Sequence, residues 1–334
     1  MTPYKLFEPL QIENLHLEHR FVMAPLTRFR ADAEHVPLAI AKKYYEQRAS
    51  VPGTLLIAEA TQISAPEGGI SHGPGIWSEP QIQRWIEITD AVQRRTSFIG
   101  GYELHAPSAI PMDPGMPVLK ELRDEETLNI INDFATAAKN AIRAGYDGVE
   151  IHGANGYLVD QFLQDVSNRR VDRWGGSVSN RALFGLEVAR AAVDAIAAMK
   201  MTDPVPQFAY FVEQLRQLNL AYLHLIESRV INNVDCEQGE SNKFLLDIWG
   251  KTSPVRVAGG YTLENAEAAL QGDYKDYEVA IVFGRHFLSN PDLPFRIRQG
   301  LDLNPYHRES FYTPIQERGY SDYTFSAEFA KVDA

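Results

Sequence analysis

Short apolar segments alternate with longer amphipathic segments along the whole chain, and this alternation limits the folds open to it. Runs such as Leu55-Leu56-Ile57-Ala58 are typical of strands buried on both faces of a parallel sheet. Strand–helix alternation over a whole chain predicts parallel strands joined by helical crossovers. We expect strands at residues 21–24, 54–60, 148–152, 221–226, 255–258 and 279–284, and helices at residues 37–48, 79–94, 124–144, 181–199, 205–218 and 263–270.

One closed barrel is the economical arrangement of these elements. No GxGxxG motif follows an expected strand, which argues against a Rossmann domain, and no linker divides the chain. A (β/α)8 barrel often takes this many residues as one domain. We therefore predict an α/β fold, a TIM barrel, formed by residues 1–334 as a single domain.

The strand count falls short of the eight that such a barrel needs to close. Beyond the strands above, the sequence offers a short segment at residues 97–99 that runs directly into Gly100 and Gly101. Between residues 182 and 218, one helix, a Thr-Asp-Pro turn at residues 202–204 and a second helix follow one another without a strand. We therefore expect the barrel to lack its fifth strand and part of its third.

The charge balance excludes some classes of partner. Lys and Arg number 32 against 44 for Asp and Glu, and the net charge of −12 is spread along the chain, so we expect no nucleic-acid or membrane partner. The single cysteine, Cys236, allows no intrachain disulfide and fits a reducing compartment. Residues 1–19 lack the apolar core of a signal peptide, and no apolar run is long enough to span a membrane. We expect a cytoplasmic protein; monomer and homodimer both remain open.

The segment 148–157 carries the most informative side chains. It reads as a buried strand followed by a loop with His152, Asn155 and Tyr157, and the carboxyl ends of barrel strands form the active site. His152 and Asn155 can each donate a hydrogen bond to one oxygen as negative charge builds on it. Tyr157 is a weak acid that can protonate a neighbouring carbon. Spacing alone favours the commoner structural roles, since Asn-Gly is above all a turn former.

The longer segment 152–181 resembles the signature of the Old Yellow Enzyme family almost without interruption. Further similarity covers residues 21–28, 74–78, 283–293 and 317–323. The resemblance implies a barrel that binds FMN at its mouth, is reduced by NADPH, and reduces the C=C bond of a small enone or enal. In that reaction hydride passes from the flavin to the β-carbon. His152 and Asn155 would hold the substrate carbonyl oxygen, and Tyr157 would protonate the α-carbon.

The resemblance also implies roles for residues on the other strands. Thr27 would hydrogen-bond the flavin ring, with Pro25, Leu26 and Ala60 as its packing surface. Glycines at the barrel's usual phosphate site permit close backbone approach, and an arginine supplies charge; here these are Gly259, Gly260, Gly284 and Arg285. Tyr320 would line the substrate cavity. We interpret the loop at residues 168–180 as mainly structural, with Asn180 capping the following helix.

The chain departs from the family pattern at two places. Near Ile99 and Gly100 the family has the end of the third strand and a loop, which supply a glutamine to the flavin and an aromatic residue to the pocket. Near residues 198–201 it has the whole fifth strand, with an arginine that faces the flavin. A genuine deletion, an incomplete gene model and omitted residues all remain open as explanations. Real deletions would weaken FMN binding and expose strand edges.

These departures keep two other functions open. One is a flavin-dependent isomerase that moves a double bond by reversible reduction. The other is a relative that no longer binds flavin and acts as a binding protein or has no activity. The retained His152, Asn155 and Tyr157 favour an enzyme, whereas the absent strand favours loss of activity.

Overall fold

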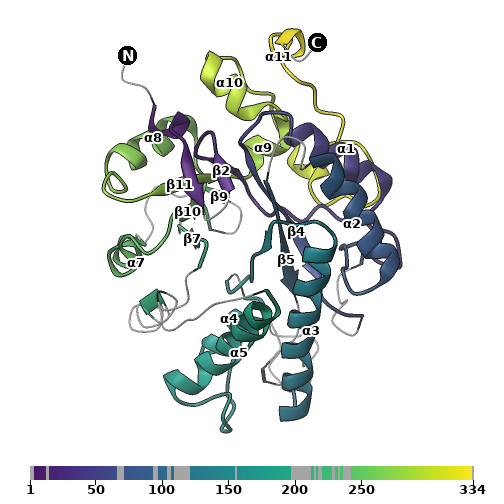
Figure 1. Cartoon of the computed structure of the whole chain (residues 1–334), viewed down its shortest axis with the longest axis vertical. Coiled ribbons are helices and arrows are strands. Elements are labelled where there is room, and N and C mark those ends of the chain that lie inside the picture. The colour runs from purple at the N-terminus through teal and green to yellow at the C-terminus, as the bar shows by residue number, and fades with distance from the viewer. Residues whose placement is uncertain are drawn as a thin grey trace.

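The structure, a computed structural model, describes residues 4–12, 15–65, 71–92, 97–103, 107–108, 121–154, 156–196, 212–213, 216, 220–227, 230–231, 234–235 and 242–332. Within these residues the chain forms one large parallel sheet with helices around it (Figure 1). No described helix has the length and apolar character that crossing a membrane requires.

The sheet of the described residues has seven strands, and every neighbouring pair is parallel. In spatial order these are β6 (Gly148–Val149), β5 (Ser97–Glu103), β4 (Leu55–Gln62), β3 (Phe21–Met23), β11 (Val279–Phe283), β10 (Val255–Ala258) and β7 (Leu223–Ile226).

Helices join and cover these strands. They are α1 (Ala39–Arg48), α2 (Glu79–Val92), α3 (Asp124–Arg143), α4 (Leu158–Leu163), α5 (Val178–Ile196), α7 (Lys243–Trp249), α8 (Leu263–Gln271), α9 (Arg285–Ser289), α10 (Leu293–Gln299) and α11 (Phe329–Val332). Figure 1 shows α7 and α8 on the side of β7 and β10, and α1, α2 and α3 on the side of β4 and β5.

Strand alternation divides the apolar residues between two cores. Val255 and Val257 of β10 belong to the larger core with the helices, whereas Ala258 packs on a smaller inner cluster. That inner cluster holds side chains from β3, β4 and β11, and the hairpin of β1 (Leu10–Ile12) and β2 (Leu15–Leu17) packs against them. The inner cluster therefore fills the space that the strands enclose, as expected for a barrel.

The strand order of the described residues has a gap between β6 and β7, and residues 197–211, where a fifth strand would fall, lie outside them. Among the described residues no strand lies between β6 and β7 along the chain, and these two strands are the two edges of the sheet. The other expected strands are all present, although β6 ends at Val149, earlier than expected. The helix expected at residues 205–218 falls mostly outside the described residues.

The expectation of a truncated third strand is wrong. β5 runs for seven residues, Ser97–Glu103, and continues straight through Gly100 and Gly101. It pairs with β4 at both ends, with a shift of register between Ile57 and Ala60. Backbone pairing does not depend on side-chain identity, so the residues that follow the glycines complete the strand.

Candidate active site at the carboxyl end of the sheet

The predicted site residues lie at one end of the sheet. Apart from Asn155 and Tyr320, they lie at or just beyond the carboxyl ends of β3, β4, β6, β10 and β11, and in a parallel sheet these ends are adjacent. Asn155 lies outside the described residues. Apart from Tyr320, the described candidates share partial exposure: Pro25, Leu26, Thr27, Ala60, His152, Tyr157, Gly259, Gly260, Gly284 and Arg285 are all half-buried.

The segment after β3 lies beside the end of β11. Ala24 N donates to Phe283 O at 3.1 Å, which continues the pairing of the two strands past Met23. A Cβ atom added at Gly284 would lie 3.7 Å from Leu26 Cδ2. The structure therefore brings the predicted flavin-packing residue Leu26 next to the predicted phosphate-binding Gly284.

The loop after β10 requires glycine for two reasons. Gly259 has a φ of +140° and Gly260 a φ of +62°, both in the region that favours glycine. A Cβ atom at Gly259 would lie 2.7 Å from Glu227 Cβ and 2.9 Å from Glu227 O. The backbone after β10 therefore passes directly against the end of β7. Arg285 lies two residues beyond the end of β11, and its Nη1 donates a hydrogen bond to Tyr306 OH at 3.4 Å.

His152 and Tyr157 lie close together after β6, with ring centroids 5.1 Å apart. The turn between them is fixed by Asp160, whose Oδ2 accepts from Gly156 N at 2.8 Å. Gly156 has a φ of +77°, as expected of the Asn-Gly turn. Burial lowers the pKa of His152, and nearby His224 lowers it further against the opposing charges of Glu150 and Asp160. A neutral imidazole at this position has one N–H to donate.

A buried polar cluster joins Glu150, which directly follows β6, to residues of β7 and β10 and of the segment before β7, and it was not predicted from the sequence. Glu150 Oε2 accepts from His224 Nδ1 at 2.9 Å and from Tyr222 OH at 3.1 Å. Arg256 Nη1 lies 3.9 Å from the same oxygen. The signal that could have found this cluster is a charged residue inside an expected apolar strand, as Glu150 is in the strand expected at 148–152 and Arg256 in the strand expected at 255–258.

The chain matches a known protein family over most of its length. Residues 5–304 match the model of the NADH:flavin oxidoreductase / NADH oxidase family. The chain belongs to this flavin oxidoreductase family. FMN is therefore its cofactor, as the sequence led us to expect.

Solved structures of this flavin oxidoreductase family share the fold. The chain is similar to the Old Yellow Enzyme of Pichia sp. AKU4542, with a TM-score of 0.88, 31% identity, and coverage of 97% of this chain and 94% of the other. It is also similar to the Old Yellow Enzyme homologue of Zymomonas mobilis, with a TM-score of 0.86, 33% identity, and coverage of 96% and 99%. The resemblance to the Old Yellow Enzyme family and the (β/α)8-barrel class are thus confirmed.

Three proteins similar to this flavin oxidoreductase come from fungi. The NADP-dependent oxidoreductase lnbE of Aspergillus flavus is 50% identical over 363 positions, which cover 96% of each chain. The chanoclavine-I aldehyde reductase fgaOx3 of Penicillium roqueforti is 47% identical over 362 positions, covering 98% of each. A probable inactive reductase, easA of Epichloe festucae var. lolii, is 44% identical over 369 positions, covering 98% of this chain and 97% of the relative.

The lengths of these alignments bear on the absent strand. Each alignment has more positions than the 334 residues of this chain, so the relatives carry residues that have no counterpart here. This agrees with the open edge between β6 and β7. The flavin oxidoreductase fold is therefore retained around the site. In the described residues, the wall of the barrel between β6 and β7 has no strand.

Tyr320 occupies a buried position in this structure. Its side chain is fully buried and stacks on Tyr44 with ring centroids 4.0 Å apart. The guanidinium of Arg30 lies 4.9 Å from its ring centroid. Its hydroxyl has no hydrogen-bond partner in the described part of the chain. The predicted substrate-lining role of Tyr320 stays a prediction.

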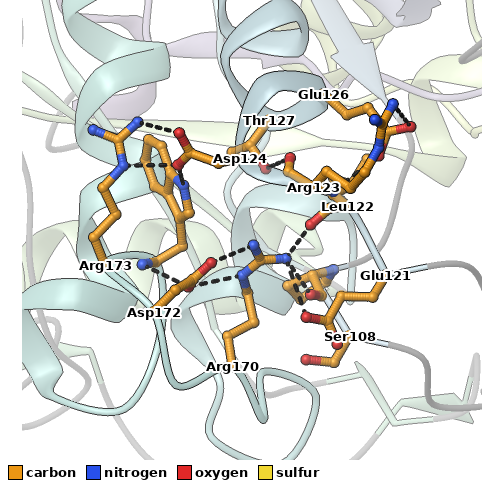
Figure 2. A network of polar contacts seen from close by, with 12 residues as sticks. Ser108, Glu121, Leu122, Arg123, Asp124, Glu126, Thr127, Arg170, Asp172 and Arg173 are labelled. Carbon is orange, nitrogen blue, oxygen red and sulfur yellow. Dashed lines mark hydrogen bonds and ion pairs between the residues drawn. The ribbon is translucent and has the colours of Figure 1, made fainter.

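The loop after α4 has the structural role expected of it. Figure 2 shows the network around Arg170, whose buried guanidinium donates to Asp172 at 2.6 and 3.0 Å. Arg170 Nη1 also donates to the carbonyl oxygens of Pro107, at 3.0 Å, and of Leu122. One side chain therefore fixes this loop against two distant segments of the chain.

The same network continues to the start of α3. Asp124 accepts hydrogen bonds from Arg173 and from the Trp174 indole N–H (Figure 2). The expected helix cap at Asn180 is wrong: α5 begins at Val178, and Ser177 Oγ accepts from Asn180 N at 3.2 Å. Serine is as good a cap as asparagine, so the sequence alone did not decide between them.

Proposed function

We propose that this flavin oxidoreductase is an NADPH-dependent ene-reductase that reduces the C=C bond of a small α,β-unsaturated aldehyde or ketone. The observation that carries the proposal is the pairing of the His152 and Tyr157 rings, 5.1 Å apart, at the mouth of the barrel. The names of two relatives, an NADP-dependent oxidoreductase and an aldehyde reductase, support the reductant and the substrate class.

The residues at the mouth fit FMN. Gly259 and Gly260 both have a positive φ, a backbone conformation that favours glycine, and they follow β10 where the barrel's phosphate site is expected. Leu26 lies against Gly284, so a flavin packed on the segment after β3 would have the second glycine site beside it. In this arrangement Pro25, Leu26, Thr27 and Ala60 hold the ring, and Gly259, Gly260, Gly284 and Arg285 hold the phosphate.

A bound FMN would supply the hydride that reduces the β-carbon of the substrate, after its own reduction by NADPH. His152 and Asn155 donate hydrogen bonds to the substrate carbonyl oxygen, which makes the β-carbon electrophilic and stabilises the negative charge that forms. Tyr157 transfers its phenolic proton to the α-carbon and regains a proton from solvent. The neutral state of His152 suits this role, because the ring then donates without exchanging a proton.

The experiment is anaerobic stopped-flow absorbance of the FMN-loaded protein. NADPH is expected to bleach the flavin near 450 nm, and 2-cyclohexenone or cinnamaldehyde is expected to restore the colour with formation of the saturated product. Bleaching by NADPH with no reoxidation by any enone or enal would overturn the ene-reductase proposal while leaving a flavin oxidoreductase.

A second candidate is a relative without catalytic activity. The open edge between β6 and β7 favours it, as does the name of the probable inactive reductase from Epichloe. Flavin content separates the two candidates, because an inactive relative that has lost its cofactor does not regain a flavin spectrum on incubation with FMN.

A further inference from the structure

A chain of buried hydrogen bonds begins in the loop that follows β10. Tyr261 comes directly after the two glycines of this loop, and Tyr274 lies in the segment between α8 and β11; both side chains are buried. Their hydroxyl oxygens are 3.0 Å apart. Tyr274 OH donates a hydrogen bond to Glu227 Oε1 at 2.9 Å. Three side chains from three separate segments therefore form one hydrogen-bonded series, which we call the hydroxyl relay.

The hydrogen bonds of the hydroxyl relay run in one direction. A phenol has a single proton to donate. Burial, with Tyr261 and Glu227 close by, raises the pKa of Tyr274, so its hydroxyl stays protonated and gives this hydrogen bond to Glu227. The Tyr274 oxygen is then left to accept from Tyr261. The relay thus ends on a carboxylate, and a hydrogen bond to a charged acceptor is stronger than one between neutral groups.

Backbone groups hold Glu227 in place at the end of the hydroxyl relay. Glu227 directly follows β7, and its N–H donates to Ala258 O at 2.8 Å, which keeps it paired with the end of β10. Its Oε1 also accepts from the N–H of Asn242, the residue before α7, at 3.3 Å. Asn242 Nδ2 in turn donates to Ile226 O at 2.7 Å. The carboxylate is therefore a fixed point to which the two tyrosines are attached.

The hydroxyl relay encloses the glycine pair of the loop. Glu227 lies against the first glycine, since a Cβ atom added at Gly259 would be 2.7 Å from Glu227 Cβ. Tyr261 directly follows the second glycine, Gly260, and its hydroxyl returns through Tyr274 to the same carboxylate. Glycine backbone is conformationally permissive and does not by itself hold one conformation. The contacts on both sides of the pair therefore supply the order that the glycines do not.

We propose that the hydroxyl relay positions Gly259 and Gly260 to bind the phosphate of FMN. The proposal rests on the FMN site of the proposed function, in which these glycines hold the phosphate. A loop that is ordered before its ligand arrives loses less conformational entropy on binding, and this raises the affinity. The flavin ring belongs to the segment after β3 instead, so the relay acts on the binding of the phosphate and not on that of the ring.

The test compares Tyr274→Phe with a matched control, Tyr277→Phe. Tyr274→Phe removes one oxygen atom and with it both hydrogen bonds of the hydroxyl relay. Tyr277 lies in the same segment and also donates to a carboxylate, but to that of the exposed Asp247 on α7. The dissociation constants of the full-length apoprotein for FMN and for riboflavin, which has the same ring without the phosphate, are measured by titration of flavin fluorescence.

We expect Tyr274→Phe to raise the dissociation constant for FMN by about three- to tenfold, the usual net effect of one lost hydrogen bond, and to leave that for riboflavin unchanged. Tyr261→Phe detaches the loop but keeps the hydrogen bond between Tyr274 and Glu227. It should show the same selective loss of FMN affinity, and it serves if Tyr274→Phe does not fold. Tyr277→Phe should leave both dissociation constants at the parent values.

Other outcomes would overturn the proposal in distinguishable ways. An equal rise in both dissociation constants would mean that the hydroxyl relay supports the fold in general and not the phosphate loop. Unchanged FMN affinity in Tyr274→Phe and Tyr261→Phe would mean that the loop is ordered without the relay. A parent protein that binds riboflavin as tightly as FMN would remove the phosphate from this loop and leave the ene-reductase proposal standing. A parent protein that binds neither flavin would remove both proposals.

Discussion

Glu150 and His224 are joined by a hydrogen bond of 2.9 Å that spans the two edges of the sheet. Glu150 directly follows β6, and His224 lies in β7, the strand at the other end of the spatial order. Side chains thus bridge the place where the described residues lack a strand. Tyr222 and Arg256 add a hydrogen bond and an ion pair to the same carboxylate.

This bridge predicts a specific dependence of stability on pH. Burial opposes ionisation of Glu150, but His224, Arg256 and the Tyr222 hydrogen bond together lower its pKa from 4.5 to about 2. A carboxyl whose pKa is lowered by folding stabilises the protein fully above pH 4.5, and this stabilisation is lost as the pH falls from 4.5 to about 2. Glu150→Gln should lower the free energy of unfolding at pH 7 by roughly 3 kcal/mol.

Urea unfolding of the parent protein and of Glu150→Gln at pH 7, 5 and 3.5 checks this prediction. The difference in the free energy of unfolding between the parent protein and Glu150→Gln should be constant from pH 7 to 5 and smaller at pH 3.5. Glu46→Gln, an exposed substitution on α1, is the control and should change little. An equal difference at all three pH values would mean that Glu150 does not carry a stabilising charge in the fold.

Tyr157→Phe tests the proton donor. We expect reoxidation of the flavin by an enone to slow by about 10²–10⁴-fold, the usual contribution of a positioned acid, while NADPH bleaches the flavin at the parent rate. Stopped-flow absorbance measures the two half-reactions separately. Tyr312→Phe, at a side chain that is 58% exposed, is the matched control. Equal slowing of both half-reactions would show that Tyr157 has another role.

His152→Ala tests the hydrogen bond to the substrate oxygen. Loss of one donor to a developing oxyanion typically slows the reaction by about 10²–10³-fold, and we expect this effect on substrate reduction alone. His16→Ala, at an exposed side chain whose ring contacts Gln11, is the control. A variant with the parent rate of substrate reduction would remove His152 from the mechanism.

Gly259→Ala tests the backbone approach at the end of β10. The new Cβ would collide with Glu227, and the φ of +140° disfavours any side chain, so we expect unfolding at lower denaturant and weaker FMN binding. Gly300→Ala is the matched control, because its φ is +66° but no atom lies within 4 Å of the new Cβ. It should cost only about 1–2 kcal/mol of stability and leave FMN affinity intact. FMN titration and guanidinium unfolding of both variants provide the comparison.

Local sequence pattern was sufficient to predict most of the sheet. Apolar runs such as residues 279–284 and 255–258 became strands because their side chains fill the cores on both faces. The absence of a fifth strand stays a prediction, because residues 197–211, where it would lie, are outside the described part of the chain. The continuation of β5 through Gly100 and Gly101 was missed, because a glycine pair weakens a strand pattern even where backbone pairing holds it.

Contacts between distant segments explain what the sequence did not predict. Glu150 and Arg256 are more than a hundred residues apart, and only the barrel brings them together. Tyr320 is buried because Arg28, itself buried, donates to the carbonyl oxygens of Phe311 and Gly319 and so holds the C-terminal segment against Tyr44. Neither arrangement leaves a periodic signal in the chain.

The central claim is that this chain, despite the open edge between β6 and β7, holds FMN at the mouth of its barrel. The most direct test is the visible absorption spectrum of the purified protein, recorded as isolated and again after incubation with FMN and removal of the excess. We predict a protein-bound flavin spectrum in at least the second sample, at close to one FMN per chain. A colourless protein that cannot be reconstituted would contradict the account and leave a member of the family that is not an enzyme.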